Sequence, residues 1–311
     1  MLDVVALGEL LIDFTCVSAD ADGYPTMAAH PGGAPANFLA AVTKFGGKTA
    51  LLGKVGADTF GRLLTGTLGQ AGIETRGIVA SSDVFTTLAF VTLDEHGDRE
   101  FAFSRKPGAD TQLTFDELDL SLIDETRVFH FGTLSLTGEP ARTTTYRAVE
   151  YAKAHGKLVT YDPNLRKPLW NDLNEAKEQM LWGLRQADVV KISDEEVEFL
   201  FGLGVQDGAQ YILDHYPVKL VFVTCGADGC WFQNRNAGGH VDSLKDIKVV
   251  DTTGAGDIFG GSAVWKLLQT GKRPEDLDEA ELTQIVSFAC RAAGLSTTKH
   301  GGISSVPDSI S

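Results

Sequence analysis

Short apolar strand-like segments alternate with helix-like segments along most of this 311-residue chain. Apolar residues at helical spacing mark the helical segments, and short runs rich in Val, Ile and Leu mark the strands. Because parallel strands need crossover connections, this alternation predicts an α/β fold with a mostly parallel sheet covered on both faces. We expect strands at residues 2–8, 49–55, 128–131, 158–162, 189–192 and 220–224, and helices at residues 36–45, 60–71, 141–155, 174–187 and 209–215.

Two segments interrupt this alternation. Residues 10–18 continue as extended chain after the first strand, and residues 86–103 have the pattern of a hairpin with its turn at 95–98. These segments could pair as a small β-sheet lid over the ligand crevice, formed by about residues 10–30 and 85–107. Its exposed apolar face would favour a homodimer. The alternative is an antiparallel edge on the main sheet. The chain contains no internal repeat or low-complexity linker, so we expect one domain over residues 1–311.

The composition excludes several classes of protein. The formal net charge of −15 argues against general binding of nucleic acid or anionic membranes. The sequence contains no run of about 18 apolar residues, so we expect no membrane-spanning helix. The chain begins directly with a strand and no basic region, so we expect no signal peptide and a cytoplasmic location. In a reducing compartment we expect the cysteines at positions 16, 225, 230 and 290 to be small buried core residues.

A glycine-rich motif at residues 251–257 indicates an anion site. Ile247, Val249 and Val250 predict a strand before it, and apolar residues at helical spacing predict a helix after it. Gly254 and Gly256 therefore lie where a helix begins, where backbone N–H groups lack partners and the helix dipole is positive. Such a helix end attracts phosphate, and glycine lets a large anion approach closely.

Asp257 adds a carboxylate beside this anion site. A negative charge there does not help a phosphate in its ground state. It does help if the carboxylate accepts the proton of a hydroxyl that attacks the phosphate. The alternative is a residue that caps the helix or complements its dipole. The motif alone leaves both interpretations open.

A second candidate site lies at residues 31–37. Gly32 and Gly33 let a ligand approach the backbone, and Pro35 suits the first position of a helix. Asn37 would project an amide near the same point, and Asp13 follows the first strand as an acceptor for hydroxyl groups. Together these groups suit a polyhydroxylated ligand. A tight turn alone explains the glycines and the proline, but it explains Asn37 and Asp13 poorly.

These motifs resemble those of a known family. Residues 32–37 and 53–61 resemble the N-terminal signature of the ribokinase-like (PfkB) sugar kinases, and residues 251–257 resemble their C-terminal signature. The two signatures stand in the expected order, and the similarity spans nearly the whole chain. Residues 8–14, 105–110 and 162–166 are most similar to the fructokinases.

The resemblance implies a fold and a reaction. The fold would be a three-layer, doubly wound, mostly parallel sheet with a small β-sheet lid. The reaction would transfer the γ-phosphate of ATP to a hydroxyl of D-fructose, giving fructose 6-phosphate, with Mg²⁺ as the cofactor and K⁺ as a candidate second ion. Alternatives within the family are a kinase for 2-keto-3-deoxygluconate, ribose or another sugar.

The resemblance also implies roles for single residues. Asp257 would be the general base, and Arg166 would clamp the transferred phosphate. An anion hole would come from the amides of Gly254, Ala255 and Gly256. Sugar contacts would come from Asp13, Gly32, Gly33, Asn37, Phe101, Phe103 and Arg105, with the last three on the lid.

Further positions would hold the nucleotide and ions. Contacts to the nucleotide would come from Lys191, Ser193, Thr224, Gly226, Gly229, Ala289 and Gly302. Glu196 would orient Mg²⁺ through water. Ser193 replaces an Asn that many members carry, which puts its own role in doubt. A monovalent cation site would involve Asp251, Thr253 and Ser305.

Two other classes of function compete with a kinase. A dinucleotide-dependent oxidoreductase would use Gly254 and Gly256, but the spacing to Gly260 differs from the usual fingerprint. A non-catalytic sugar-binding protein would need no carboxylate in the phosphate loop, so replacing Asp257 with Asn would leave it functional.

Overall fold

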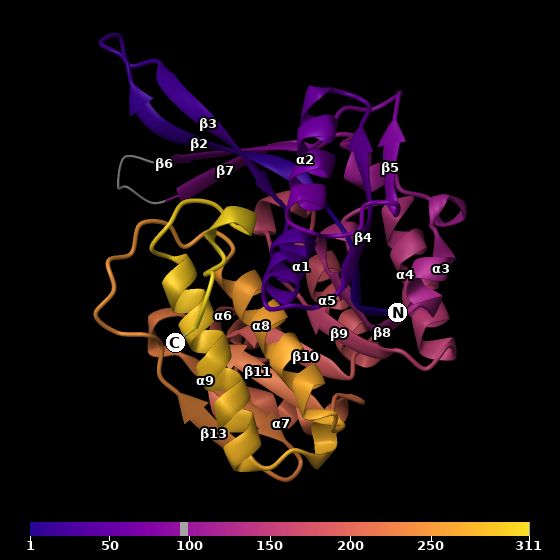
Figure 1. Ribbon diagram of the computed structural model, residues 1–311, viewed down its shortest axis with the longest axis vertical. Coiled ribbons are helices and arrows are strands. Elements are labelled where there is room, and N and C mark those ends of the chain that lie inside the picture. Colours follow the sequence, from indigo (N-terminus) through magenta and orange to yellow (C-terminus); the bar gives the residue numbers. More distant parts are fainter. Residues whose placement is uncertain (94–98, 311) are drawn as a thin grey trace.

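The computed structural model describes residues 1–93 and 99–310, with the side chains of residues 92, 93 and 99–101 outside that description. Its main feature is a nine-stranded sheet in the order β13-β12-β11-β10-β9-β8-β1-β4-β5 (Figure 1). All neighbours are parallel except the pairs β11–β12 and β12–β13. The strands are β1 Leu2–Leu7, β4 Thr49–Gly56, β5 Ile78–Ser81, β8 Thr126–Gly132, β9 Leu158–Asp162, β10 Val189–Ser193, β11 Leu220–Thr224, β12 Cys230–Asn234 and β13 Gly238–Val241.

Helices cover both faces of this sheet. Alternate residues of β1 show the two sides: Val5 and Leu7 belong to an apolar cluster with residues of α3, α4, α5, α6 and α7, whereas Val4 and Ala6 belong to a cluster with residues of α1, α2, α8 and α9. The three-layer arrangement predicted from the alternation is therefore confirmed. The helices are α1 Ala34–Lys44, α2 Thr59–Gln70, α3 Leu120–Asp124, α4 Ala141–Ala154, α5 Leu173–Gln186, α6 Asp194–Phe201, α7 Val205–His215, α8 Ala255–Thr270 and α9 Glu279–Ser296. Within the described residues, none of them is long and apolar enough to cross a membrane.

Cys230 and Cys290 are buried as expected, but Cys16 on strand β2 (Leu11–Ala19) is exposed and Cys225 is half-buried. The expectation of four buried core cysteines is therefore wrong for Cys16 and Cys225.

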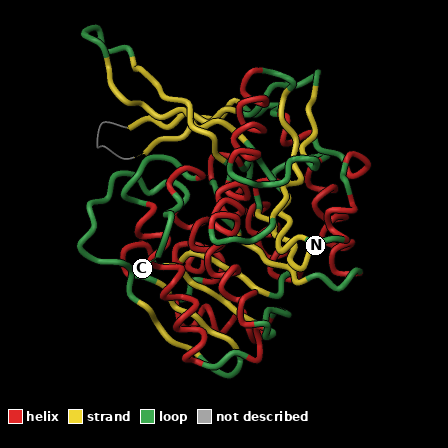
Figure 2. The backbone as a smooth tube through the Cα atoms, in the orientation of Figure 1, coloured by secondary structure: helices red, strands yellow, loops and turns green. Residues whose placement is uncertain are grey.

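A second sheet projects from the main body (Figures 1 and 2). Its order is β3-β2-β6-β7, with β2 parallel to β6 and the other pairs antiparallel. The small sheet expected from two separate segments is therefore confirmed, and the alternative of an edge on the main sheet is wrong. The turn expected at residues 95–98 lies outside the described residues. The strands are β2 Leu11–Ala19, β3 Pro25–Gly32, β6 Leu88–Leu93 and β7 Arg99–Ser104.

The strand predicted at residues 247–250 is wrong. Residues 242–254 form neither a helix nor a strand, and the side chains of Val249 and Val250 are exposed. The backbone N–H groups of Val250 and Asp251 both donate to the carbonyl of Thr297, just after α9. The segment thus runs along the end of a helix and has no neighbouring strand. The β-branched residues favour extended backbone but cannot supply a partner.

The expected helix after this segment is confirmed. α8 begins at Ala255, and Gly254 precedes it with φ of 76°, a left-handed conformation that suits glycine. At the other motif, α1 begins at Ala34, so Pro35 occupies the second helical position and not the first. Both positions lack an intrahelical N–H partner, so either suits proline. The N-termini of α1 and α8 thereby lie beyond the carboxyl ends of the central strands, the usual ligand side of such sheets.

Candidate functional site

A cavity of about 490 Å³ lies between the main sheet and the lid. Its walls come from β2 and the lid hairpin, from the starts of α1, α6 and α8, and from the loop after β9. The lining residues that the argument uses are Glu9, Asp13, Gly33, Asn37, Phe103, Asn164, Arg166, Lys167, Lys191, Ser193, Glu196, Phe199, Thr224, Gly226, Thr253, Gly254, Gly256 and Asp257.

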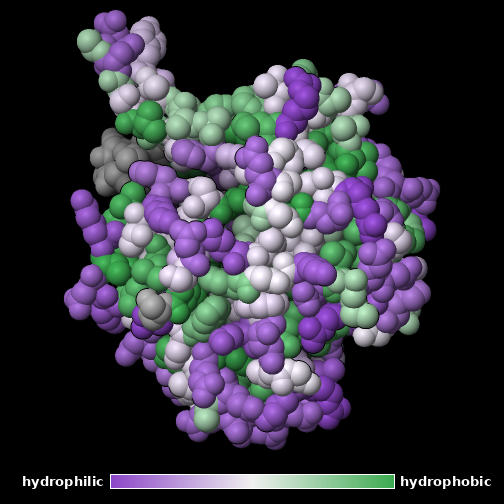
Figure 3. All heavy atoms as spheres, in the orientation of Figure 1, coloured by the Kyte–Doolittle hydropathy of each residue, from purple (hydrophilic) through white to green (hydrophobic). Residues whose placement is uncertain are grey.

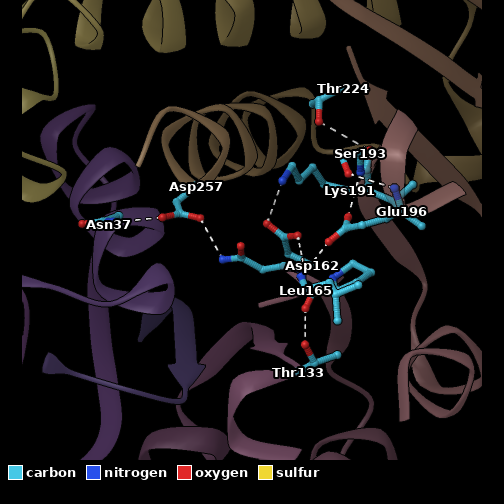
Figure 4. A network of polar contacts seen from close by, with 12 residues as sticks. Asn37, Thr133, Asp162, Leu165, Lys191, Ser193, Glu196, Thr224 and Asp257 are labelled. Atoms are coloured by element: carbon cyan, nitrogen blue, oxygen red, sulfur yellow. Dashed lines mark hydrogen bonds and ion pairs between the residues drawn. The ribbon is translucent and has the colours of Figure 1, made fainter. Parts of the chain in front are cut away.

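Asp257 lies in the first turn of α8 with its carboxylate buried at the cavity wall. One oxygen accepts a hydrogen bond from Asn37 Nδ2 at 2.9 Å, and the other accepts from Asn164 Nδ2 at 3.3 Å (Figure 4). A capping carboxylate would instead accept from backbone N–H groups of its own helix. The contacts to two side-chain amides therefore disfavour the capping interpretation.

The surroundings of Asp257 suit proton transfer. Burial raises the pKa of its carboxyl above the usual range, while the hydrogen bond from Asn37 and the charges of Lys191 and Arg166 oppose that rise. A carboxylate whose pKa moves towards neutrality is a better proton acceptor near neutral pH than an ordinary aspartate.

The sugar-side motif packs tightly around Asp13. A Cβ on Gly32 would lie 2.1 Å from Asp13 Oδ2, and one on Gly33, whose φ is 119°, would lie 2.4 Å from the carbonyl oxygen of Glu9. A side chain at Gly33 would be strained and would clash with the backbone, and one at Gly32 would displace the carboxylate of Asp13. Burial raises the pKa of Asp13 to about 6, opposed by Arg166 and reinforced by the negative charge of Asp257.

Asn37 has one polar atom to spare. Its Nδ2 is used by Asp257, but its Oδ1 is buried and accepts no hydrogen bond from the described residues. Gly302 approaches so closely that a Cβ there would lie 2.1 Å from this oxygen. A buried acceptor without a donor is costly, so the position of Asn37 is held by its contact with Asp257 and by the packing of Gly302, at the expense of one unsatisfied oxygen.

A second polar network lines the other side of the cavity (Figure 4). Lys191 forms an ion pair with Asp162 at 3.0 Å. Burial alone would lower the pKa of Lys191, but the negative charges of Asp162, Glu196 and Asp257 outweigh it and leave the pKa raised. Ser193 and Glu196 form a reciprocal capping box at the start of α6, and Glu196 Oε1 also accepts from the N–H of Leu165 at 2.7 Å. Ser193, which replaces the expected Asn, thus has a structural role.

The acidic residues at the start of α6 could bind Mg²⁺ only if waters and substrate phosphates supplied the remaining donor atoms. The described residues contain no group of three His, Cys, Asp or Glu side chains that could hold a metal. Mg²⁺ commonly binds one or two carboxylates together with waters and substrate phosphates. Glu196, with Asp194 and Glu195 beside it on the cavity wall, provides such a donor set.

Comparison with known proteins decides the family. The family model "pfkB family carbohydrate kinase" matches residues 1–309. The chain belongs to the pfkB family of carbohydrate kinases. This membership confirms the resemblance seen in the motifs, and it argues against a dinucleotide-dependent oxidoreductase.

The relatives of this kinase include fructokinases. The chain is 45% identical over 308 residues to Fructokinase-1 of Zea mays, and the alignment covers 98% of this chain and 94% of that protein. Among solved structures, fructokinase from Xylella fastidiosa with bound ATP has a TM-score of 0.90 at 30% identity, covering 99% and 96% of the two chains. Fructokinase from Vibrio cholerae O395 with fructose, ADP and calcium ion has a TM-score of 0.85 at 32% identity, covering 98% and 96%.

The cavity of this carbohydrate kinase brings together most of the predicted site residues. The predicted residues that line it are Asp13, Gly33, Asn37, Phe103, Arg166, Lys191, Ser193, Glu196, Thr224, Gly226, Thr253, Gly254, Gly256 and Asp257. Gly32 and Gly302 lie directly behind it, against Asp13 and Asn37. The side chain of Phe101 lies outside the described residues. The binding roles of the predicted site residues stay predictions.

Arg105 does not line the cavity. Its guanidinium is buried and donates to Asp110, to Thr137 Oγ1 at 2.7 Å and to the carbonyl of Leu134 at 2.8 Å. These bonds fix the end of β7 to the main body. The structure therefore gives Arg105 the role of an anchor at the base of the lid in place of the predicted sugar contact.

Three other predicted residues also lie away from the cavity wall. Ala289 is fully buried among apolar residues of α9 and the sheet, and Gly229 closes the turn before β12 against the backbone of residues 241–243. The N–H of Ala255 donates to the carbonyl of Thr252 at 3.2 Å. An anion hole would therefore rest on Gly254 and Gly256, without the amide of Ala255.

The loops expected to hold a monovalent cation do meet. Asp251 Oδ1 accepts from the N–H of Thr253 at 2.9 Å, and its Oδ2 accepts from the N–H of Gly301 at 3.0 Å. Ser305 is buried and donates its hydroxyl to the carbonyl of Gly302. The carboxylate thus ties the two loops together, and a cation there stays a prediction.

Sequence reasoning assigned no role to Glu9, Asn164 or Lys167, which all line the cavity. Glu9 is 3% exposed, and its Oε1 accepts from the N–H of Ala34 at 2.8 Å. Burial raises the pKa of Glu9 to about 7. Glu9 and Asn164 lie inside the fructokinase-like segments 8–14 and 162–166. The sequence therefore marked these segments, but it did not show which of their side chains line the cavity.

Proposed function

We propose that this kinase transfers the γ-phosphate of ATP to a hydroxyl of D-fructose, giving fructose 6-phosphate. The observation that carries the proposal is the position of Asp257, held by Asn37 and Asn164 at the N-terminus of α8 in a cavity that Asp13 also lines. The fructokinase relatives and the neighbour with fructose and ADP support this choice of substrate.

The reaction is an in-line displacement at phosphorus. The sugar hydroxyl attacks the γ-phosphorus while Asp257 takes its proton, and the bond to the oxygen of ADP breaks with its electron pair. The amides of Gly254 and Gly256 stabilise charge on the phosphoryl oxygens. Asp13 accepts hydrogen bonds from other hydroxyls and so orients the sugar, while Asn37 holds Asp257 in place.

Cations balance the charge of the phosphates. Arg166 is exposed and donates to the carbonyl of Leu165 at 3.3 Å, a contact that it can exchange for the transferred phosphate. Mg²⁺, when bound, would neutralise phosphate charge, with Glu196 holding one of its waters. Activation by K⁺ at the loop of Asp251 is part of the proposal, and exchange of KCl for choline chloride in the assay tests it.

The lid supports the proposal of a homodimer, and a cytoplasmic location is proposed beside it from the sequence alone. Phe14 and Phe90 stack at 5.3 Å on the small sheet, and Val17 and Tyr24 are 60% and 71% exposed. Figure 3 shows hydrophobic residues gathered near the base of the projecting lid and a mixture of hydrophilic and hydrophobic residues towards its tip. Light scattering on purified protein should give twice the chain mass. Val17→Asp combined with Tyr24→Asp should give the mass of one chain.

A coupled assay for ADP release across a panel of free sugars tests the substrate. With MgATP present, D-fructose should give the highest kcat/KM, and ribose or 2-keto-3-deoxygluconate should give little turnover. Turnover with another sugar but not with fructose would replace the substrate and keep the kinase. Binding of fructose without any ADP release would favour the non-catalytic sugar-binding alternative.

A further inference from the structure

The charge balance of the cavity is unfavourable for a nucleotide. Among the described lining residues, carboxylates outnumber cations, and the polyphosphate of ATP adds further negative charge. The cations that line the cavity must therefore be available for phosphate. These cations are Arg166, Lys167 and Lys191, and the carboxylates are Glu9, Asp13, Asp194, Glu195, Glu196 and Asp257.

Two of the three cationic side chains already have another partner or another role. Lys191 pairs with Asp162 at 3.0 Å, and its side chain is only 13% exposed. Arg166 lines the same cavity as Asp13 and Asp257, and the proposed function assigns its guanidinium to the transferred phosphate. Neither residue is left to hold the rest of the polyphosphate.

Lys167 is the remaining cation. Its side chain is exposed, and its ammonium lies 5.9 Å from the ring centre of Phe199 and forms no ion pair within residues 1–93 and 99–310. Phe199 also lines the cavity and belongs to α6. The hydrogen bond from Leu165 to Glu196 fixes this loop to the start of α6 (Figure 4). Lys167 is thus held on the α6 side of the cavity.

We propose that Lys167 is a second phosphate-binding cation, which contacts the polyphosphate of the bound nucleotide. The inference rests on the proposed nucleotide-dependent kinase activity. A lysine ammonium is a compact charge on a flexible stem, and it can follow a phosphate group without a fixed geometry. Because Lys167 is exposed, salt should screen its contribution.

Calorimetric binding of MgADP to Lys167→Met tests the proposal without any phosphoryl transfer. At low salt the Kd for ADP should rise about fivefold, the size expected for an exposed charge pair. The difference from the wild type should shrink in 0.5 M salt, which screens charges beyond a few ångströms. Lys167→Arg keeps the charge and should bind ADP nearly as the wild type does.

Steady-state kinetics separates this role from others. Lys167→Met should raise the KM for ATP while kcat and the KM for fructose stay within about twofold. Lys177→Met, on α5 away from the cavity, is the matched control and should change nothing.

Unchanged affinity of Lys167→Met for ADP would overturn the inference, and so would a loss of kcat without a change in ADP binding. In both cases the proposed function would stand if the wild type still phosphorylates fructose. Wild-type protein that binds no ADP would overturn both.

Discussion

Asn37 donates its side-chain amide to the carboxylate of Asp257 at 2.9 Å, although the two residues lie 220 positions apart in the chain. The contact joins the start of α1 to the start of α8 (Figure 4). The two helices can approach because Gly261 has no side chain: a Cβ there would lie 2.2 Å from the carbonyl oxygen of Phe38. The sugar site and the proposed base are thereby built as one unit.

Asn37→Ala should shift the pH dependence of catalysis. The hydrogen bond from Asn37 lowers the pKa of Asp257, so its loss raises that pKa further. A base must be ionised, so the acid limb of kcat/KM should move to higher pH, and kcat/KM at neutral pH should fall about tenfold or more. Profiles from pH 5 to 9 measure this shift. Asn174→Ala, on α5, should leave the profile unchanged, and an unshifted limb in Asn37→Ala would contradict the coupling.

The KM for fructose should depend on the protonation of Asp13. Its pKa is about 6, so the carboxylate accepts hydroxyl hydrogen bonds above that pH and loses this capacity as the pH falls through it. The wild-type KM should rise below pH 6. Asp13→Asn should have a KM raised about tenfold or more that no longer follows pH. A wild-type KM that stays flat down to pH 5 would argue against Asp13 as a sugar ligand.

Glu9 should make the protein less stable at alkaline pH. Its folded pKa of about 7 lies above the ordinary 4.5, so its stabilising effect is complete below 4.5 and is lost as the pH rises through 7. Glu9→Gln should reduce the fall in unfolding free energy between pH 5 and pH 8 by about 2–3 kcal/mol. Urea unfolding at both pH values measures the change. The exposed Glu150→Gln should not alter it, and an equal fall in Glu9→Gln and wild type would refute the assignment.

Two glycine substitutions should have opposite effects. Gly254 has φ of 76°, and a Cβ there would lie 3.0 Å from Asn37 Nδ2 and from Gly302 Cα. Gly254→Ala should therefore lower both stability and kcat. Gly66, in α2, has open space around it, so Gly66→Ala should stabilise by up to about 1 kcal/mol and leave kcat unchanged. Thermal unfolding and the sugar assay compare them. Wild-type activity in Gly254→Ala would show that the helix start tolerates a side chain.

The sequence was informative where local chemistry fixes the structure. The alternating pattern predicted the three layers because parallel strands need covered faces, and the two glycine motifs predicted the starts of α1 and α8 because glycine and proline restrict the backbone there. Asn37 and Asp257 could be found because each lies within such a motif, and Asp13 because it follows the first strand. Their mutual contact depends on the packing of α1 on α8, which no local pattern contains.

The remaining errors have tertiary causes. Residues 247–250 have strand propensity, but their neighbour in space is the end of α9 and not another strand. Arg105 has a motif that resembles a sugar contact, but Asp110, Thr137 and the carbonyl of Leu134 take its guanidinium. Lys167 belongs to no motif, and only its place beside Phe199 shows that it faces the cavity.

The turnover of Asp257→Asn tests the central claim most directly. Asparagine keeps the size of the side chain but cannot accept the proton, so kcat with fructose and MgATP should fall about 10²–10⁴-fold while calorimetric affinities for fructose and ADP change little. Asp214→Asn, exposed on α7, is the control and should retain full activity. Wild-type turnover in Asp257→Asn would contradict the assignment of Asp257 as the base.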